Sequence, residues 1–178
     1  MPGTHHLFTV TRLLLRIATG FCFFLIAVLA LAMGALELAA LGLFHLPIPP
    51  NEMHGLSMAQ ILSAASLVIG GGVICIALAA WMFILTARII DTASTGDPFV
   101  AKNADRLNHI ACLLLVIQAV GFTVDALMNL FPASITDNVS VGYDGFSAAG
   151  VLAALLIFVL AQIFRRGSEM RAELEGTV

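Results

Sequence analysis

Four long apolar stretches separated by polar breaks dominate the hydrophobic pattern of the chain. They cover residues 13–44, 59–90, 107–131 and 146–164. Each stretch is close to or above the roughly 20 residues that an α-helix needs to cross the hydrocarbon of a bilayer. The pattern therefore predicts an all-α polytopic membrane protein, in which residues 1–178 form a single four-transmembrane-helix bundle.

The composition points to lipid as the main solvent. The chain is 60% hydrophobic and 11% charged, whereas soluble domains carry about 25% charged residues. So few charges cannot cover a water-facing surface. The net charge of −3, without a basic block, argues against direct binding of nucleic acid.

The basic residues predict how the protein lies in the membrane. They occur near the N-terminus, between the second and third stretches, and after the fourth. The eight are Arg12, Arg16, Arg88, Lys102, Arg106, Arg165, Arg166 and Arg171. The connections 45–58 and 132–145 contain no Lys or Arg. By the positive-inside rule, both termini and the middle connection are cytoplasmic.

Local signals refine the predicted helix boundaries. The pair Ser57 and Gln60 has the spacing of a capping box and predicts the start of the second helix. Asp97-Pro98 places an N-cap residue before a proline, so we expect the third helix to begin near Pro98. Charge pairs four residues apart favour a helical cytoplasmic tail over residues 165–175. The bundle should therefore carry short cytoplasmic helical extensions.

Two segments at the predicted cytoplasmic side carry a family resemblance. One is Gly96-Asp97-Pro98-Phe99 followed by Asn103 and Arg106-Leu107, and the other is Phe164-Arg165-Arg166-Gly167-Ser168-Glu169 followed by Glu173 and Thr177-Val178. With the four spans, they resemble the bacterial membrane family catalogued as domain of unknown function 2975 (DUF2975). Met170 stands where the tail of that family usually has leucine.

The resemblance implies a multi-pass protein of the bacterial cytoplasmic (inner) membrane and brings no established activity. It also implies a gene often found beside that of a small helix-turn-helix regulator, which makes such a regulator a partner to test. We expect a non-enzymatic binding or regulatory protein that engages a cytoplasmic partner. The expected contact residues are Phe99, Asn103, Arg106, Arg165, Arg166, Glu169 and Glu173.

Two apolar stripes at helical spacing accompany these segments. The first consists of Val100, Asn103, Leu107 and Ile110, and the second of Ile163, Gly167, Met170 and Leu174. Stripes of this kind pack on each other, on a second copy in a homo-oligomer, or on another protein.

Polar residues inside the apolar stretches suggest an alternative function. Glu37 and Asp125 fall at similar depths near the outer edge of the hydrocarbon, and Gln118 and Asn129 share a stripe with Asp125. Intramembrane carboxylates are costly and often functional, so these four residues form a candidate ligand pocket of a small carrier, channel or sensor. The competing interpretation is that the carboxylates reach headgroups or water.

Catalytic and metal-binding patterns are weak. The three cysteines lie in apolar runs and are expected to pack as small apolar residues. His45, Glu52 and His54 have the chemistry of metal ligands, but we expect them to be solvated loop residues. The sequence therefore predicts no enzyme, no cofactor and no metal site.

Overall fold

Four long helices form the described part of the protein. The computed structural model describes residues 2–43, 56–94, 98–132, 135 and 147–175. The helices are α1 (Pro2–Ala40), α2 (Met58–Ser94), α3 (Ala101–Met128) and α5 (Ala148–Glu175). Each contains a stretch long and apolar enough to span a membrane. The predicted all-α, four-helix membrane bundle is confirmed.

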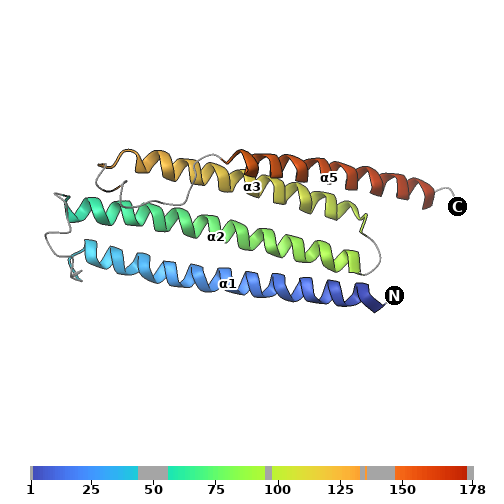
Figure 1. Ribbon diagram of the computed structural model, residues 1–178, viewed down its shortest axis with the longest axis horizontal. Coiled ribbons are helices and arrows are strands. Elements are labelled where there is room, and N and C mark those ends of the chain that lie inside the picture. Colours follow the sequence, from blue (N-terminus) through green and yellow to red (C-terminus); the bar gives the residue numbers. More distant parts are fainter. Residues whose placement is uncertain (1, 44–55, 95–97, 133–134, 136–146, 176–178) are drawn as a thin grey trace.

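The helices pack in chain order, and successive helices run antiparallel (Figure 1). Contacts join α1 to α2, α2 to α3, and α3 to α5. Because α1 packs mainly on α2, large side chains such as Phe24 and Leu31 are exposed. In a bilayer these side chains contact acyl chains, which are as apolar as they are.

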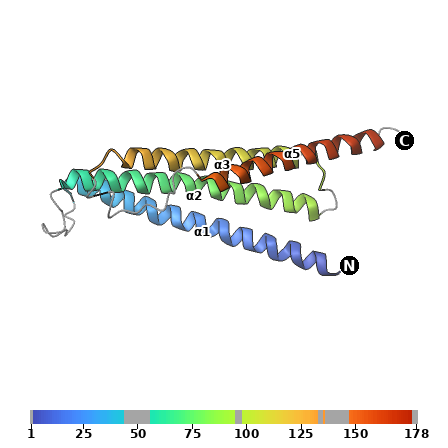
Figure 2. The same cartoon turned by 45° about the horizontal axis from the view of Figure 1, so that its top comes forward.

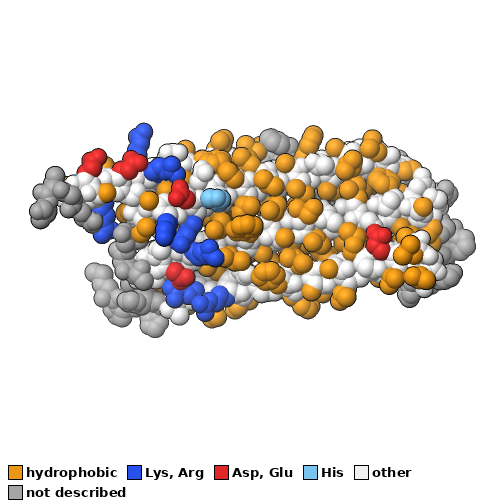
Figure 3. Space-filling model, turned by 180° about the vertical axis from the view of Figure 1, so that it is seen from behind, with side chains coloured by type: hydrophobic (Ala, Val, Ile, Leu, Met, Phe, Trp, Pro, Cys, Tyr) orange, Lys and Arg blue, Asp and Glu red, His pale blue; other side chains and the backbone are white. Residues whose placement is uncertain are grey.

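The charged residues divide the molecule into two unlike ends. Lys and Arg side chains gather at one end, and an apolar band covers most of the remaining face (Figure 3). Both termini lie at this same end (Figure 1). We call it the basic end; its residues include Arg12, Arg16, Arg88, Lys102, Arg106, Arg165 and Arg166.

The start of α2 is the capping box that the sequence predicts. The backbone N–H of Ser57 donates to Gln60 Oε1 at 3.0 Å. In return, the backbone N–H of Gln60 donates to Ser57 Oγ at 3.3 Å. These reciprocal bonds satisfy two of the donors left open at a helix start.

The start of α3 differs from the expectation. The helix begins at Ala101 and not near Pro98, and Val100 is extended with φ −87° and ψ 135°. The carbonyl of Pro98 instead accepts a hydrogen bond at 3.0 Å from the side-chain amide of Asn103. This bond holds Pro98 outside the helix; Asp97, the expected N-cap, lies outside the described residues.

Glycines bring α2 close to both of its neighbours. A Cβ on Gly71 would lie 2.5 Å from Val124 Cγ2 of α3, and one on Gly70 would lie 3.2 Å from Met33 Cε of α1. The helix continues without a break through these positions. The glycines therefore act as close-packing positions, as small residues commonly do between membrane helices.

Replacing Gly71 should separate α2 from α3. In Gly71→Leu the new side chain overlaps Val124, whose branched side chain has little rotamer freedom in a helix. We expect a loss of about 1–3 kcal/mol, measured as a lower midpoint of thermal unfolding in detergent micelles. The matched control is Gly20→Leu, because a Cβ there meets nothing within 4 Å. Equal midpoints for both variants would contradict the close packing.

Candidate functional site

Asn103 is the centre of a buried polar cluster at the basic end. Its side chain is 0% exposed. The amide nitrogen donates to Thr92 Oγ1 at 2.7 Å and to the Pro98 carbonyl at 3.0 Å. The amide oxygen accepts from Arg106 Nη1 at 2.8 Å. One side chain thus joins the end of α2, the connection after it and the first turns of α3.

Arg106 extends this cluster back to α2. The same Nη1 atom donates to the carbonyl of Arg88 at 2.9 Å. Arg88 lies six residues before the end of α2 at Ser94, so this bond joins α3 to the backbone of the last two turns of α2. The hydrogen bonds of Asn103 and Arg106 therefore hold the first turns of α3 against α2 and the connection between them.

Phe99 connects the beginning of α3 to α5. Its ring centroid lies 5.1 Å from that of Phe164, with the two rings tilted by 38°. On the other side, a Cβ on Gly167 would lie 2.9 Å from Phe99 Cδ1. Only glycine leaves this space open, so Gly167 is a contact position and not a flexible one.

Two ion pairs join neighbouring helices at the basic end. Arg165 and Asp105 link α5 to α3 at 2.8 Å, and Arg12 and Asp91 link α1 to α2 at 2.7 Å. All four side chains are at least one-third exposed. Such pairs contribute about 0–1 kcal/mol each to the free energy of unfolding. Their main effect is therefore to align neighbouring helices along their axes.

The two segments that carry the family resemblance therefore form one contact region. Asn103 and Arg106 hold α3 against α2, while Phe99, Phe164 and Gly167 hold α5 against the beginning of α3. Of the expected partner residues, Asn103 is fully buried and therefore structural. Arg166, Glu169 and Glu173 are exposed on α5.

The sequence did not single out Thr92, Asp91 or Asp105 as members of this region. Thr92 bonds its own helix through Ile89 and is eleven residues from its second partner, Asn103. Asp105 lies 60 residues from Arg165 in the chain. Only the packing of the helices brings these groups together.

The outer-edge residues of the alternative hypothesis are divided between helices. Glu37 is exposed on α1 and lines a groove shared with α2, and Asp125 is not among the residues of that groove. Gln118 packs on α5, where its amide nitrogen occupies the space of a Cβ on Gly150. Asn129 donates to the carbonyl of Asp125 at 3.0 Å. A ligand site formed by these four residues remains a prediction.

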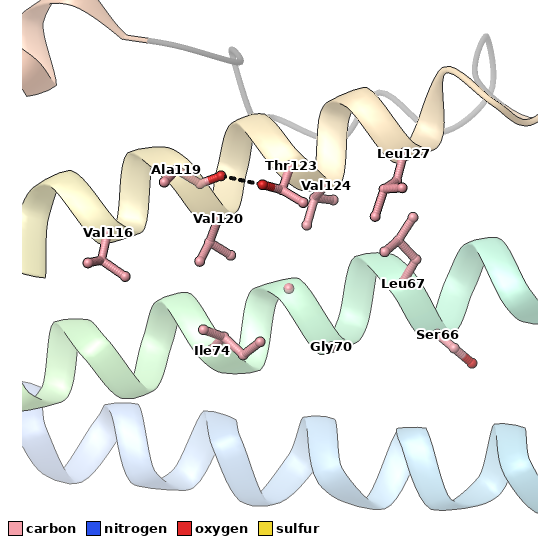
Figure 4. Close-up of a pocket in the computed structure, with 11 residues that line it drawn as sticks. Ser66, Leu67, Gly70, Ile74, Val116, Ala119, Val120, Thr123, Val124 and Leu127 are labelled. Atoms are coloured by element: carbon pink, nitrogen blue, oxygen red, sulfur yellow. Dashed lines mark hydrogen bonds between the residues drawn. The ribbon is translucent and has the colours of Figure 1, made fainter.

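A groove between α2 and α3 has a volume of about 500 Å³. Figure 4 shows Val116, Val120 and Val124 of α3 facing α2 across it. The hydroxyl of Thr123 donates to the carbonyl of Ala119 at 2.8 Å, so it is used within α3 (Figure 4). The walls suit an acyl chain and offer little to a polar ligand.

The candidate metal ligands and the cysteines fall in different parts of the chain. No group of three or more His, Cys, Asp or Glu residues that could hold a metal occurs among the residues described. His45, Glu52 and His54 lie outside them. Cys22, Cys75 and Cys112 form no disulfide, and Cys22 is buried.

Comparison with known proteins identifies a family. The sequence model of a family described as "Protein of unknown function (DUF2975)" matches residues 45–178. The matched region includes α2, α3 and α5 and therefore the whole contact region around Asn103 and Phe99. No curated protein and no solved structure matches the chain.

Removing the Asn103 amide should destabilise the basic end. Asn103→Ala removes a fully buried amide and leaves the half-buried Thr92 and Arg106 groups without this partner, which costs about 1–3 kcal/mol. The free energy of unfolding can be measured by SDS titration in mixed micelles, followed by circular dichroism. Asn129→Ala is the control: this exposed amide bonds only within its own helix, and we expect a change below about 0.5 kcal/mol. Similar losses of the free energy of unfolding in both variants would contradict a stabilising role of the Asn103 cluster.

Proposed function

Because the chain belongs to the DUF2975 family, whose description assigns no activity, we propose a function from its own geometry. The protein is a non-enzymatic regulatory component of the bacterial cytoplasmic membrane. The basic end faces the cytoplasm, and the projecting end of α5 binds a cytoplasmic protein.

The distribution of charge supports this orientation. The basic end includes seven of the eight Lys and Arg residues named above, and the eighth, Arg171, is on the same end of α5. Basic residues near membrane spans are retained on the cytoplasmic side. With four spans, both termini lie on that side.

The observation that carries the proposal is the exposed apolar surface at the end of α5. This end projects beyond the other three helices in two views (Figures 1 and 2). Met170 is 60% exposed and Leu174 is 72% exposed. Both follow Arg165 and Arg166, so they stand in water, where apolar surface costs about 25 cal/mol per Å². A partner that covers them would recover this free energy.

The base of α5 is held firmly enough to present this surface. Phe99 packs against Phe164 and Gly167, and Asp105 pairs with Arg165. These contacts fix the helix before the projecting turns begin. A preorganised helix loses less conformational entropy on binding than a flexible tail.

Exposed charges beside the apolar surface favour one orientation of a bound partner. Arg166, Glu169 and Glu173 lie on the same turns as Met170 and Leu174. Rim charges of this kind contribute more to specificity and association rate than to affinity. The partner to test first is the small helix-turn-helix regulator of a neighbouring gene, which would be held at the membrane by this contact.

The orientation can be tested by cysteine labelling in intact cells. In a background without the native cysteines, Ser57→Cys should react with an impermeant maleimide added outside. Ser168→Cys should react only after the membrane is opened. Labelling of residue 168 in sealed cells would contradict the proposed orientation. It would also contradict the proposal that α5 binds a cytoplasmic protein.

The docking surface can be tested with the purified regulator and the protein in nanodiscs. Met170→Glu should weaken binding at least about tenfold, since replacing a central apolar contact commonly costs 2 kcal/mol or more. Ala172→Glu adds the same charge on a different face of α5 and should bind as the original chain does. The dissociation constants can be compared by microscale thermophoresis.

Truncation of the α5 end tests whether the docking surface lies there. Removing residues 168–178 should abolish binding while leaving insertion and thermal stability in nanodiscs unchanged. If the truncated chain binds the regulator as tightly as the full chain, or if the full chain does not bind, the proposal is wrong.

A further inference from the structure

A third groove, also between α1 and α2, differs from the other two in having a cation at one end. Its volume is about 350 Å³. The lining residues include Phe23, Ile26, Ala77, Trp81, Ile84 and Arg88. All but Arg88 are apolar, and Arg88 belongs to the basic end. The groove is therefore amphipathic along its length.

The length of the groove matches one leaflet. From Ala77 to Arg88, α2 rises about 16 Å at 1.5 Å per residue. Half of a hydrocarbon core of about 30 Å is similar. The groove therefore accommodates an acyl chain that enters from the leaflet at the basic end, whereas a helix from a second copy would contact the full thickness.

The register of α1 against α2 places a second cation, Arg16, at the level of Arg88. In the antiparallel pair, Arg12 is level with Asp91 and Met33 is level with Gly70. The same register places Arg16 level with residue 87. Arg16 also lies two helical turns before Phe23, on the same side of α1 as that lining residue.

The ion pairing of Arg16 and Arg88 decides whether the mouth of the groove can hold an anion. Within the residues described, no carboxylate lies within salt-bridge distance of Arg16 or Arg88. The nearby Asp91 pairs with Arg12 instead. Arg88 takes part in the contact region only through its backbone carbonyl, which accepts from Arg106. Its guanidinium is therefore available to a ligand.

We propose that this groove is a binding site for an anionic phospholipid of the leaflet at the basic end. One acyl chain lies along α2 from Ile84 toward Ala77, and the phosphate pairs with Arg88 and Arg16. A zwitterionic lipid brings its own cation to the headgroup and gains less from two arginines. The site is separate from the partner surface proposed on α5.

Trp81 makes the proposal directly testable, because it lines the groove and is the only tryptophan in the chain. The protein is reconstituted in vesicles of phosphatidylcholine with increasing fractions of phosphatidylglycerol, and only one of the two lipids is brominated on its acyl chains in each series. Bromine quenches tryptophan fluorescence at contact. Each arginine near an anionic surface favours association by about 1 kcal/mol. We expect brominated phosphatidylglycerol to produce the same quenching of Trp81 as brominated phosphatidylcholine at a lower mole fraction. The mole fraction should be roughly fivefold lower for each arginine that contributes.

Charge-matched variants separate this site from general attraction to the surface. Arg88→Gln should reduce the preference for phosphatidylglycerol about fivefold, because it removes one of the two cations. Lys102→Gln removes the same charge at the basic end of α3, away from the groove, and should leave the preference unchanged. Ala77→Phe fills the groove and should reduce quenching by the anionic lipid. Circular dichroism of each variant verifies that the helices are retained.

Three results would overturn the proposal. Equal quenching by the two brominated lipids would mean that Trp81 contacts bulk lipid only. An equal effect of Arg88→Gln and Lys102→Gln would assign the preference to the surface charge as a whole. No quenching by either lipid would mean that another occupant, such as a second copy of the chain, covers the groove.

Discussion

A bilayer offers no hydrogen bonds to a polypeptide, and the rest of this structure depends on that constraint. Each backbone N–H and C=O inside the hydrocarbon must find a partner within the protein, so the apolar stretches are helices. Polar side chains are then concentrated where the chain leaves the hydrocarbon. Asn103 is buried there with the Arg106 guanidinium as a donor and a backbone carbonyl as an acceptor. The most specific contacts of the fold therefore lie at its basic end.

Packing inside the hydrocarbon follows a different rule, because burial in protein and exposure to lipid differ little for apolar groups. The helices associate where backbones can approach, and Gly70 and Gly71 mark such points. Met33 fills the space beside Gly70, and Val124 fills the space beside Gly71. Elsewhere the helices keep large side chains exposed to lipid, as Phe24 and Leu31 of α1 do. An open arrangement in chain order is therefore stable without a large closed core.

The sequence predicted the features that depend on local pattern. Hydrophobic length gave the four helices, and the spacing of Ser57 and Gln60 gave the cap of α2. It misplaced the start of α3, because the Asn103 amide takes the Pro98 carbonyl and this long-range cluster overrides the local proline signal. The sequence also could not predict the ion pair of Asp105 with Arg165 or the contact of Phe99 with Gly167. Both depend on how α3 and α5 pack. The residues of the site were recognisable, but their separation into buried and exposed members was not.

The two proposed surfaces occupy parts of the molecule with different structural demands. The family match covers α2, α3 and α5, and the cluster at Asn103 uses residues of α2, α3 and the connection between them. α1 joins this unit through contacts with α2, including Arg12 with Asp91 and Met33 with Gly70. This seam also carries the groove lined by Phe23, Ile26 and Trp81, which has room for a lipid chain. The end of α5, in contrast, is fixed at its base by aromatic packing and then projects. Under the two proposals, lipid composition acts on the α1–α2 seam and a protein partner acts on α5. The contacts of α2 with α3 and of α3 with α5 connect the two surfaces.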